Sequence, residues 1–238
     1  MVITLKKFWE TVHVEKVHSC FRILLDKKPI VLPGKTILEV DTLKMANCIA
    51  QEWRNVAKTK GDVVSYQKLP MTRIVGTMIE KISPKRDIYI NALIPYFNSD
   101  CLCYFSDNSA QLLARQKEAW LPAIKLFENK FGFSVKTTLG VMPIIQDFEG
   151  IKQIKNYLMN LSDAKLTAMT LLVPSLGSFI LSILIVERVY SPSEAYTIAF
   201  FDELYQSKVW GQDREQEKKH TEIKTDIEDA YSFLSILC

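Results

Sequence analysis

Apolar and polar side chains alternate along the first forty residues, and this alternation predicts a small antiparallel sheet. Every second residue is apolar over 21–25, and a turn of charged residues and proline begins at Asp26. Another alternating run covers 37–41, beyond the chain-breaking pair Pro33-Gly34. Short alternating runs separated by turns are typical of hairpins, so we expect the chain to open with an antiparallel meander.

Helical spacing takes over after this sheet. Asp41 or Thr42 can cap an apolar stripe that extends to Ala57, and three further helices are predicted at 70–82, 83–97 and 108–130. Short strands are expected at 100–106 and 133–138. Ser191-Pro192-Ser193-Glu194 has the order of a capping box and predicts one helix that ends near Trp210.

Alternation stops at Thr138, and the later segments show only helical spacing. The pattern therefore predicts an α+β fold in two parts. Residues 1–145 should form a small N-terminal domain of antiparallel strands and helices. Residues 146–238 should form an all-helical C-terminal domain.

One apolar stretch, residues 166–186, carries no charged side chain and is long enough to cross a bilayer. Pro174, Gly177 and several hydroxyl side chains interrupt it. Because proline removes a backbone donor and disfavours helix at the residue before it, we interpret the stretch as two buried helices broken near Pro174. A membrane-associated protein remains the alternative.

Composition narrows the class of protein. The 238 residues are 48% hydrophobic and 24% charged, with 30 basic and 27 acidic side chains mixed along the chain. No basic block marks a nucleic-acid partner. The five cysteines are odd in number and lack the spacing of a disulfide framework, which indicates a reducing compartment. With no visible signal segment, this favours the cytoplasm of a bacterium, or the mitochondrial matrix for a processed organellar chain.

Motifs that carry catalysis are missing. The sequence has no Walker loop, no dinucleotide-binding glycine pattern, no nucleophile elbow and no His-Glu-x-x-His. Cys101 and Cys103 are expected on one face of a strand and not around a metal. We therefore predict no catalytic residue, cofactor or metal. A small carboxylate-dependent hydrolase of unknown substrate stays open, since an Asp and a Glu distant in sequence can meet in space.

Four segments are nevertheless unusual. Gln51–Arg54 places Trp53 on an apolar helical stripe, and Leu69–Arg73 joins an apolar loop to a charge. Residues 137–143 form an apolar loop at the proposed domain junction, for which a packed linker is the plainer interpretation. Residues 202–215 gather acidic and aromatic side chains around a helix end, a composition typical of protein-binding surfaces.

These segments, in this order, resemble the ATP synthase assembly chaperones of mitochondria and alphaproteobacteria, which act on the alpha subunit of the catalytic sector. The resemblance runs through Lys7–Glu10, Leu25-Asp26, Pro29, Pro33, Ala50–Trp53, Pro70–Arg73, Asp100–Tyr104, Arg115-Gln116, Trp120, Pro122, Thr138, Gly140, Gln146, Gly177-Ser178, Asp202-Glu203, Gln206, Trp210-Gly211, Asp213 and Glu215. The chain departs from the family pattern at Lys27, Leu121 and Tyr205, where glycine, aspartate and tryptophan are usual.

The resemblance implies a chaperone and not an enzyme. Its partner would be the unassembled alpha subunit, held until the beta subunit replaces the chaperone, with no nucleic acid, no stable membrane insertion and a monomeric state. The implied client-binding residues are Asp202, Glu203, Gln206, Trp210, Asp213 and Glu215, and the second candidates are Glu52, Trp53 and Arg73. The opposing interpretation of Glu203 is an ion pair with Arg214 or Lys208 that only joins two helices.

Overall fold

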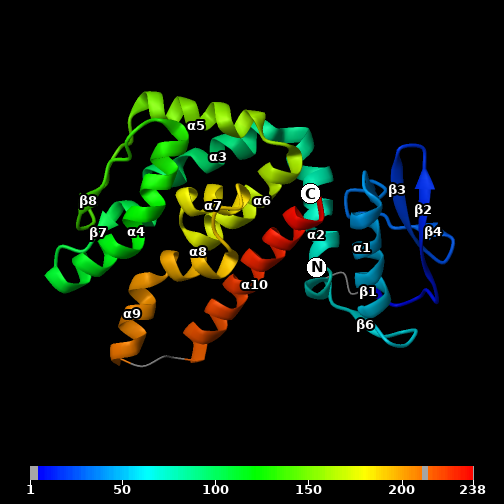
Figure 1. Cartoon of the computed structure of the whole chain (residues 1–238). Helices are drawn as coiled ribbons and strands as arrows, with labels where there is room; N and C mark the ends of the chain where they lie inside the picture. Colours follow the sequence, from blue (N-terminus) through cyan, green and yellow to red (C-terminus); the bar gives the residue numbers. More distant parts are fainter. Residues whose placement is uncertain (1–4, 211–213, 238) are drawn as a thin grey trace. The chain divides into compact units, whose positions relative to one another are not determined.

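The computed structural model describes residues 5–210 and 214–237, except for the side chains of residues 208–210 (Figure 1). The chain divides into two compact units. The first comprises Met1–Pro84 with Ser232–Cys238, and the second comprises Lys85–Tyr231.

The first unit is built on the predicted meander. Its four-stranded antiparallel sheet contains β2 (Val12–Val17), β3 (Cys20–Leu25), β4 (Lys28–Pro29) and β5 (Glu39–Val40). A two-residue turn joins β3 to β4, with Asp26 in the left-handed region at a φ of 56°. Aspartate tolerates this conformation, so the turn closes without the glycine that is usual after it in the family. A separate strand pair joins β1 (Leu5–Lys6) to β6 (Val63–Val64).

Helix α1 (Leu43–Asn55) covers this sheet (Figure 1). Thr42 caps it by accepting a hydrogen bond from the Met45 amide, as predicted. Ala46, Ile49 and Trp53 are buried on its apolar stripe. After a short 3-10 turn (Tyr66–Lys68), α2 (Pro70–Thr77) continues into a π-helical segment (Met78–Ile82).

The second unit surrounds one apolar helix. All eight residues of α7 (Phe179–Val186) are buried, and α3 (Arg86–Asn98), α4 (Ala110–Phe131), α6 (Asp163–Leu176) and α8 (Pro192–Ala199) pack around it. The unit is completed by α5 (Phe148–Asn160), α9 (Phe201–Trp210) and most of α10 (Arg214–Leu237). Two short parallel strands, β7 (Tyr104–Phe105) and β8 (Thr138–Leu139), lie beside α4. Beyond β8 the described residues are helical or irregular, which confirms the predicted fold class.

The apolar stretch 166–186 forms two buried helices, as predicted, but the break lies elsewhere. Pro174 sits exposed inside α6, and the helix ends at Gly177, whose φ of 61° is left-handed. Ser178 then caps α7 by accepting from the Leu181 amide. Among the described helices, none is both long enough and apolar enough to cross a bilayer.

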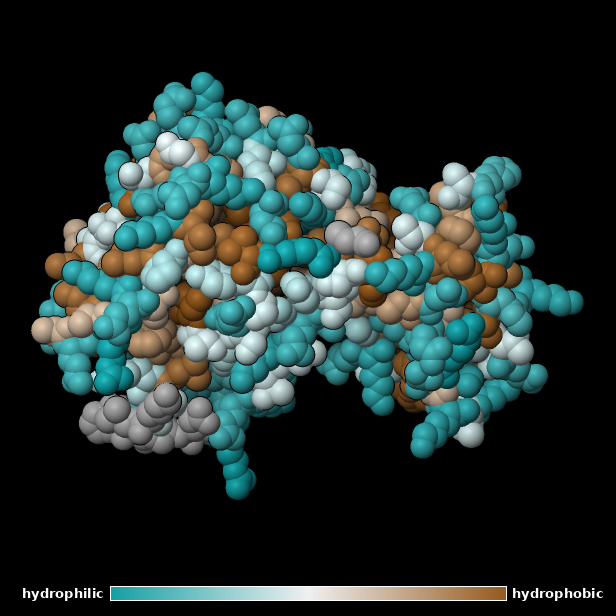
Figure 2. All heavy atoms as spheres, viewed as in Figure 1, coloured by the Kyte–Doolittle hydropathy of each residue, from teal (hydrophilic) through white to brown (hydrophobic). Residues whose placement is uncertain are grey.

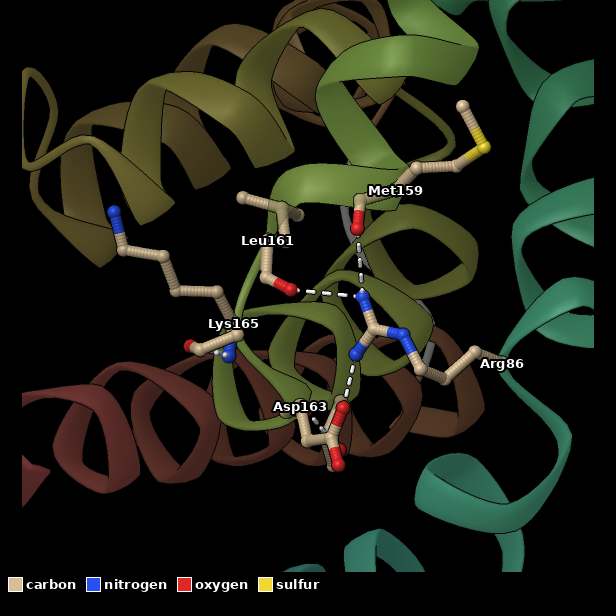
Figure 3. Close-up of polar contacts among 7 residues, drawn as sticks. Arg86, Met159, Leu161, Asp163 and Lys165 are labelled. Carbon is tan, nitrogen blue, oxygen red and sulfur yellow. Dashed lines mark hydrogen bonds and ion pairs between the residues drawn. The ribbon is translucent and has the colours of Figure 1, made fainter.

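A basic side chain fastens the corner between α5 and α6 (Figure 3). Arg86 pairs with Asp163 in the first turn of α6 and donates to the carbonyl oxygens of Met159 (3.2 Å) and Leu161 (2.8 Å). These carbonyls lie at the C-terminus of α5, where a positive charge is favourable. The corner is therefore set by α3 as well as by its own sequence.

Local predictions are wrong in three places. The strand predicted at 133–138 is irregular up to Thr138, where the two-residue β8 begins. Residues 101–103 form a 3-10 helix and not a strand, because the buried Asp100 caps it by accepting from the Leu102 amide. The predicted single helix from Ser191 is two helices that break at Phe200, although the capping box with Glu194 is present. Phe200 packs against Tyr196 and His220, with ring centroids 4.8 and 5.3 Å apart.

Along the chain, the first unit gives way to the second between Pro84 and Lys85, whereas the sequence places its domain boundary after residue 145. The difference arises because β7 and β8, which carry the last strand signals, belong to the second unit together with the helices around α7. As a division into domains that fold on their own, the boundary at 145 stays a prediction.

Candidate functional site

The acidic and aromatic segment of the sequence lies on α9, which packs against α4 and α8 (Figure 1). Asp202, in its first turn, is half-buried and accepts two hydrogen bonds from the Gln116 amide nitrogen, at 2.9 and 2.8 Å. Burial raises the pKa of Asp202, while the bond from Gln116 opposes that rise. The Asp202 carboxylate is therefore engaged within the protein and fixes α9 to α4.

Gln116 is itself fully buried, and its carbonyl oxygen accepts from the Ser106 amide at 2.7 Å. One side chain thus joins the end of β7 to the start of α9. Nearby, the Trp120 indole donates to the Ile198 carbonyl at 3.0 Å. These contacts hold the surface of α9 in a defined position, because each buried polar group has its partner.

Glu203 and Gln206 lie on the exposed side of the same helix. Partial desolvation raises the pKa of Glu203, and the neighbouring His220 and Lys219 oppose the rise. No ion pair joins Glu203 to the side chains that the structure describes. The pairing with Arg214 is therefore not seen, and Lys208 lies outside the described side chains.

Aromatic side chains flank these polar groups. Phe201 and Tyr205 stack with ring centroids 6.4 Å apart, and the Arg115 guanidinium lies 5.5 Å from the Tyr205 ring. All three are partly or fully accessible to solvent. An aromatic pair beside exposed carboxylate and amide groups has the composition of a protein-binding surface.

Sequence reasoning missed a cluster near Glu203. The Tyr196 hydroxyl lies 2.7 Å from His220 Nδ1, and the Lys224 ammonium lies 4.6 Å from the Tyr196 ring. Tyr196 comes from α8, and it is separated by more than twenty positions from His220 and Lys224, which lie on α10. No spacing rule could have joined them.

Three predicted site residues complete the segment. Trp210 ends α9, but its side chain lies outside the described part of the chain, as does Asp213. Glu215 is exposed in the first turn of α10. Their gathering with Glu203 stays a prediction.

The second candidates lie in the first unit, and two of them are structural. Glu52 accepts hydrogen bonds from the Met71 amide and from the amide and hydroxyl of Thr72. Trp53 is buried and donates to the Thr72 hydroxyl at 3.0 Å. The segments 51–54 and 69–73 are therefore one capping arrangement at the start of α2. Arg73 is exposed and lines a pocket of about 310 Å³ with Leu32, Pro33, Tyr66, Gly76 and Glu80.

Little in the described residues would support catalysis. No group of three or more His, Cys, Asp and Glu side chains among them could hold a metal ion. Burial raises the pKa of both the Cys101 and the Cys103 thiol, which keeps them protonated. Neither thiol is therefore activated as a nucleophile.

Known proteins resemble the whole chain. The model of the family described as ATP12 chaperone protein matches residues 6–128, just over half of the chain. The mitochondrial protein atp12 of Schizosaccharomyces pombe is 27% identical over 87% of this chain and 74% of its own length. The α9 surface lies beyond the part that the family model matches, so its likeness rests on such longer alignments.

Two solved structures share the fold. Atp12 from Paracoccus denitrificans superposes with a TM-score of 0.90 at 29% identity, covering 97% of each chain. The Atu1473 protein from Agrobacterium tumefaciens gives a TM-score of 0.89 at 28% identity, covering 99% of this chain and 87% of its own. By sequence and fold together, the chain belongs to the ATP12 chaperone protein family, the assembly chaperones of ATP synthase, and is not an enzyme.

Proposed function

We propose that this chaperone binds the unassembled alpha subunit of ATP synthase, shields its apolar interface and hands it to the beta subunit. Family membership supports a chaperone of this assembly, and the resemblance of the quoted segments supports the alpha subunit as client. A subunit without its partner exposes apolar surface that aggregates unless covered. A chaperone that the beta subunit displaces needs only moderate affinity, which a few aromatic anchors with a polar rim provide.

The observation that carries the proposal is the outer surface of α9. Glu203 and Gln206 are exposed beside the stacked Phe201 and Tyr205. The hydrogen bond between Gln116 and Asp202 holds the helix against α4. A carboxylate presented on an anchored helix, without an ion pair to the described side chains, has no evident role in folding. It can act as a contact that strengthens when a partner excludes water.

The substitution Glu203→Gln tests this assignment. If the carboxylate is desolvated against the client, the variant should lose about 2 kcal/mol of binding, roughly thirtyfold, and keep its thermal stability. The matched control is Glu228→Gln, which neutralises another exposed carboxylate, on α10. The measurement is capture of tagged alpha subunit, expressed with and without the beta subunit, together with the melting temperature of each variant.

Two results would contradict the proposal at different levels. Normal capture by both Glu203→Gln and Trp210→Ala would remove the α9 surface from the binding site. Failure of the unsubstituted protein to capture alpha subunit would remove the client. Because the beta subunit is expected to displace the chaperone, its co-expression should lower capture by the unsubstituted protein.

We further propose that the chain acts as a monomer where ATP synthase is assembled. That compartment is the bacterial cytoplasm or the mitochondrial matrix, and both a bacterial structure and a mitochondrial protein are among its relatives. Sedimentation of the purified protein measures the oligomeric state directly.

A further inference from the structure

The segment from β8 to the start of α5, residues 139–148, presents large apolar side chains to solvent. We call it the apolar loop. Its side chains are exposed to 90% at Val141, 76% at Ile145, 74% at Phe148 and 72% at Met142. No charged residue lies between Leu139 and Gln146. In Figure 2 apolar residues interrupt the hydrophilic surface at the left-hand edge, where Figure 1 places β7 and β8. The plainer interpretation of residues 137–143 as a packed linker is therefore wrong, since Leu139, Val141 and Met142 are exposed.

The backbone of the apolar loop is nevertheless fixed. The Gly140 amide donates to the Phe105 carbonyl at 2.8 Å, and the Ile144 amide lies 3.4 Å from the Tyr104 hydroxyl. Gly140 has a φ of 77°, and a Cβ there would lie 2.7 Å from an oxygen of the Asp107 carboxylate. The positive φ therefore favours glycine at this corner.

Gln146 holds the other end of the loop. Its side chain is fully buried and forms two hydrogen bonds with the backbone of Lys136, each 2.9 Å long. Its own amide donates to the Asn98 side chain at 3.0 Å. The loop is thus fastened on both sides while its apolar side chains face outward. Such a rigid loop loses little conformational entropy on binding, which favours affinity.

The apolar loop and the α9 surface share one frame. Gly140 donates a hydrogen bond to Phe105. Ser106, which follows Phe105, donates to Gln116, and Gln116 donates to Asp202. Every member of this chain of contacts lies in the second compact unit. A partner that reaches both surfaces would therefore meet groups whose separation is set by the fold.

We propose that the apolar loop is the hydrophobic anchor of the chaperone for the same client. It contacts an apolar patch on the unassembled ATP synthase subunit, while α9 supplies the polar contact. The inference rests on the proposed function. Residues 139–146 of the loop carry no charge and expose large apolar side chains, which favours an apolar partner surface, and the flexible Met142 side chain can adapt to it. Asp147 within the loop and Glu149 just beyond it are negatively charged, and their charge disfavours an anionic lipid surface as the occupant.

The test is the double variant Val141→Asp with Ile145→Asp. Both side chains are exposed, so the variant should fold and should melt at the same temperature as the unsubstituted protein. Capture of tagged alpha subunit should fall by about tenfold or more, because two apolar contacts are replaced by charges. The matched control is Ile88→Asp, which places a charge at a single apolar side chain of α3 that is 63% exposed.

The outcomes separate three cases. Loss of capture by the loop variant alone supports the inference. Equal capture by the loop variant and the unsubstituted protein overturns it and leaves the proposed function intact, whereas no capture by the unsubstituted protein overturns both. Flotation with vesicles of phosphatidylcholine and phosphatidylglycerol is the remaining arm. If the unsubstituted protein floats with the vesicles and the loop variant does not, the loop is a membrane contact and the inference is overturned.

Discussion

Replacing Glu52 with alanine should destabilise the first unit without touching the client site. The Glu52 carboxylate accepts from the Met71 amide at 2.6 Å, the Thr72 amide at 2.9 Å and the Thr72 hydroxyl at 2.7 Å. Both amides belong to the first turn of α2, where backbone donors have no partner within the helix. The residue at the N-cap position, Leu69, has no side chain that could accept them. Glu52 therefore caps α2 from another helix.

The magnitude follows from these three contacts. A lost N-cap acceptor costs about 0.5–2 kcal/mol, and a single hydrogen bond to a charged group contributes about 1.5–3 kcal/mol. The contacts share one carboxylate and are partly accessible to water, so their values do not add in full. We expect Glu52→Ala to lower the free energy of unfolding by about 2–3 kcal/mol. Glu52→Gln keeps one acceptor oxygen and should lose about half as much.

Urea unfolding followed by circular dichroism measures the loss, and alpha-subunit capture below the unfolding transition measures function. Gln51→Ala, at an exposed neighbour on α1, is the matched control. A Glu52→Ala protein as stable as the control would refute the capping role. A protein that is folded but captures no alpha subunit would instead restore Glu52 as a client contact.

Two predictions concern pH. Burial opposes ionisation of Glu187, but hydrogen bonds from Lys130, Tyr157 and Lys165 outweigh it and hold its pKa at about 2. The stabilisation from this carboxylate should be complete above about pH 4.5 and disappear as the pH falls toward 2. Acid unfolding of Glu187→Gln should therefore lack the loss of stability between these two pH values. Burial raises the pKa of Asp100 to about 6. Since the folded state then holds the proton more tightly than the unfolded state, the free energy of unfolding should fall as the pH rises from about 4 to 6. Urea titrations of Asp100→Asn should not show this dependence on pH.

Features set by neighbouring residues could be predicted from the sequence. The Thr42 cap and the capping box at Ser191 each need only a few adjacent positions. The sheet needs alternation and turns within thirty residues. These signals therefore appear in the sequence before any tertiary contact is known, and they sufficed for the fold class.

Features set by distant residues could not be predicted. Residues 101–105 look like a strand because they are apolar, yet the adjoining Asp100 accepts from Ser178 and Ile180, about eighty positions away. The bond from Gln116 to Asp202 spans a similar distance. Sequence patterns show that such polar residues are unusual, but not what they meet. For the same reason the sequence makes Glu52 a second candidate for client binding and does not show its contacts with Met71 and Thr72.

The residues that carry the family resemblance separate by what they contact. Glu52, Asp100, Gln116 and Gln146 are polar groups that each satisfy backbone amides or another side chain within their own compact unit. A buried polar group without its partner is costly, so these positions are explained by folding alone. Glu203 differs, since it is exposed and forms no ion pair with the described side chains. Resemblance therefore identifies the family, whereas the search for a client surface should begin where a shared polar residue has no role in the fold.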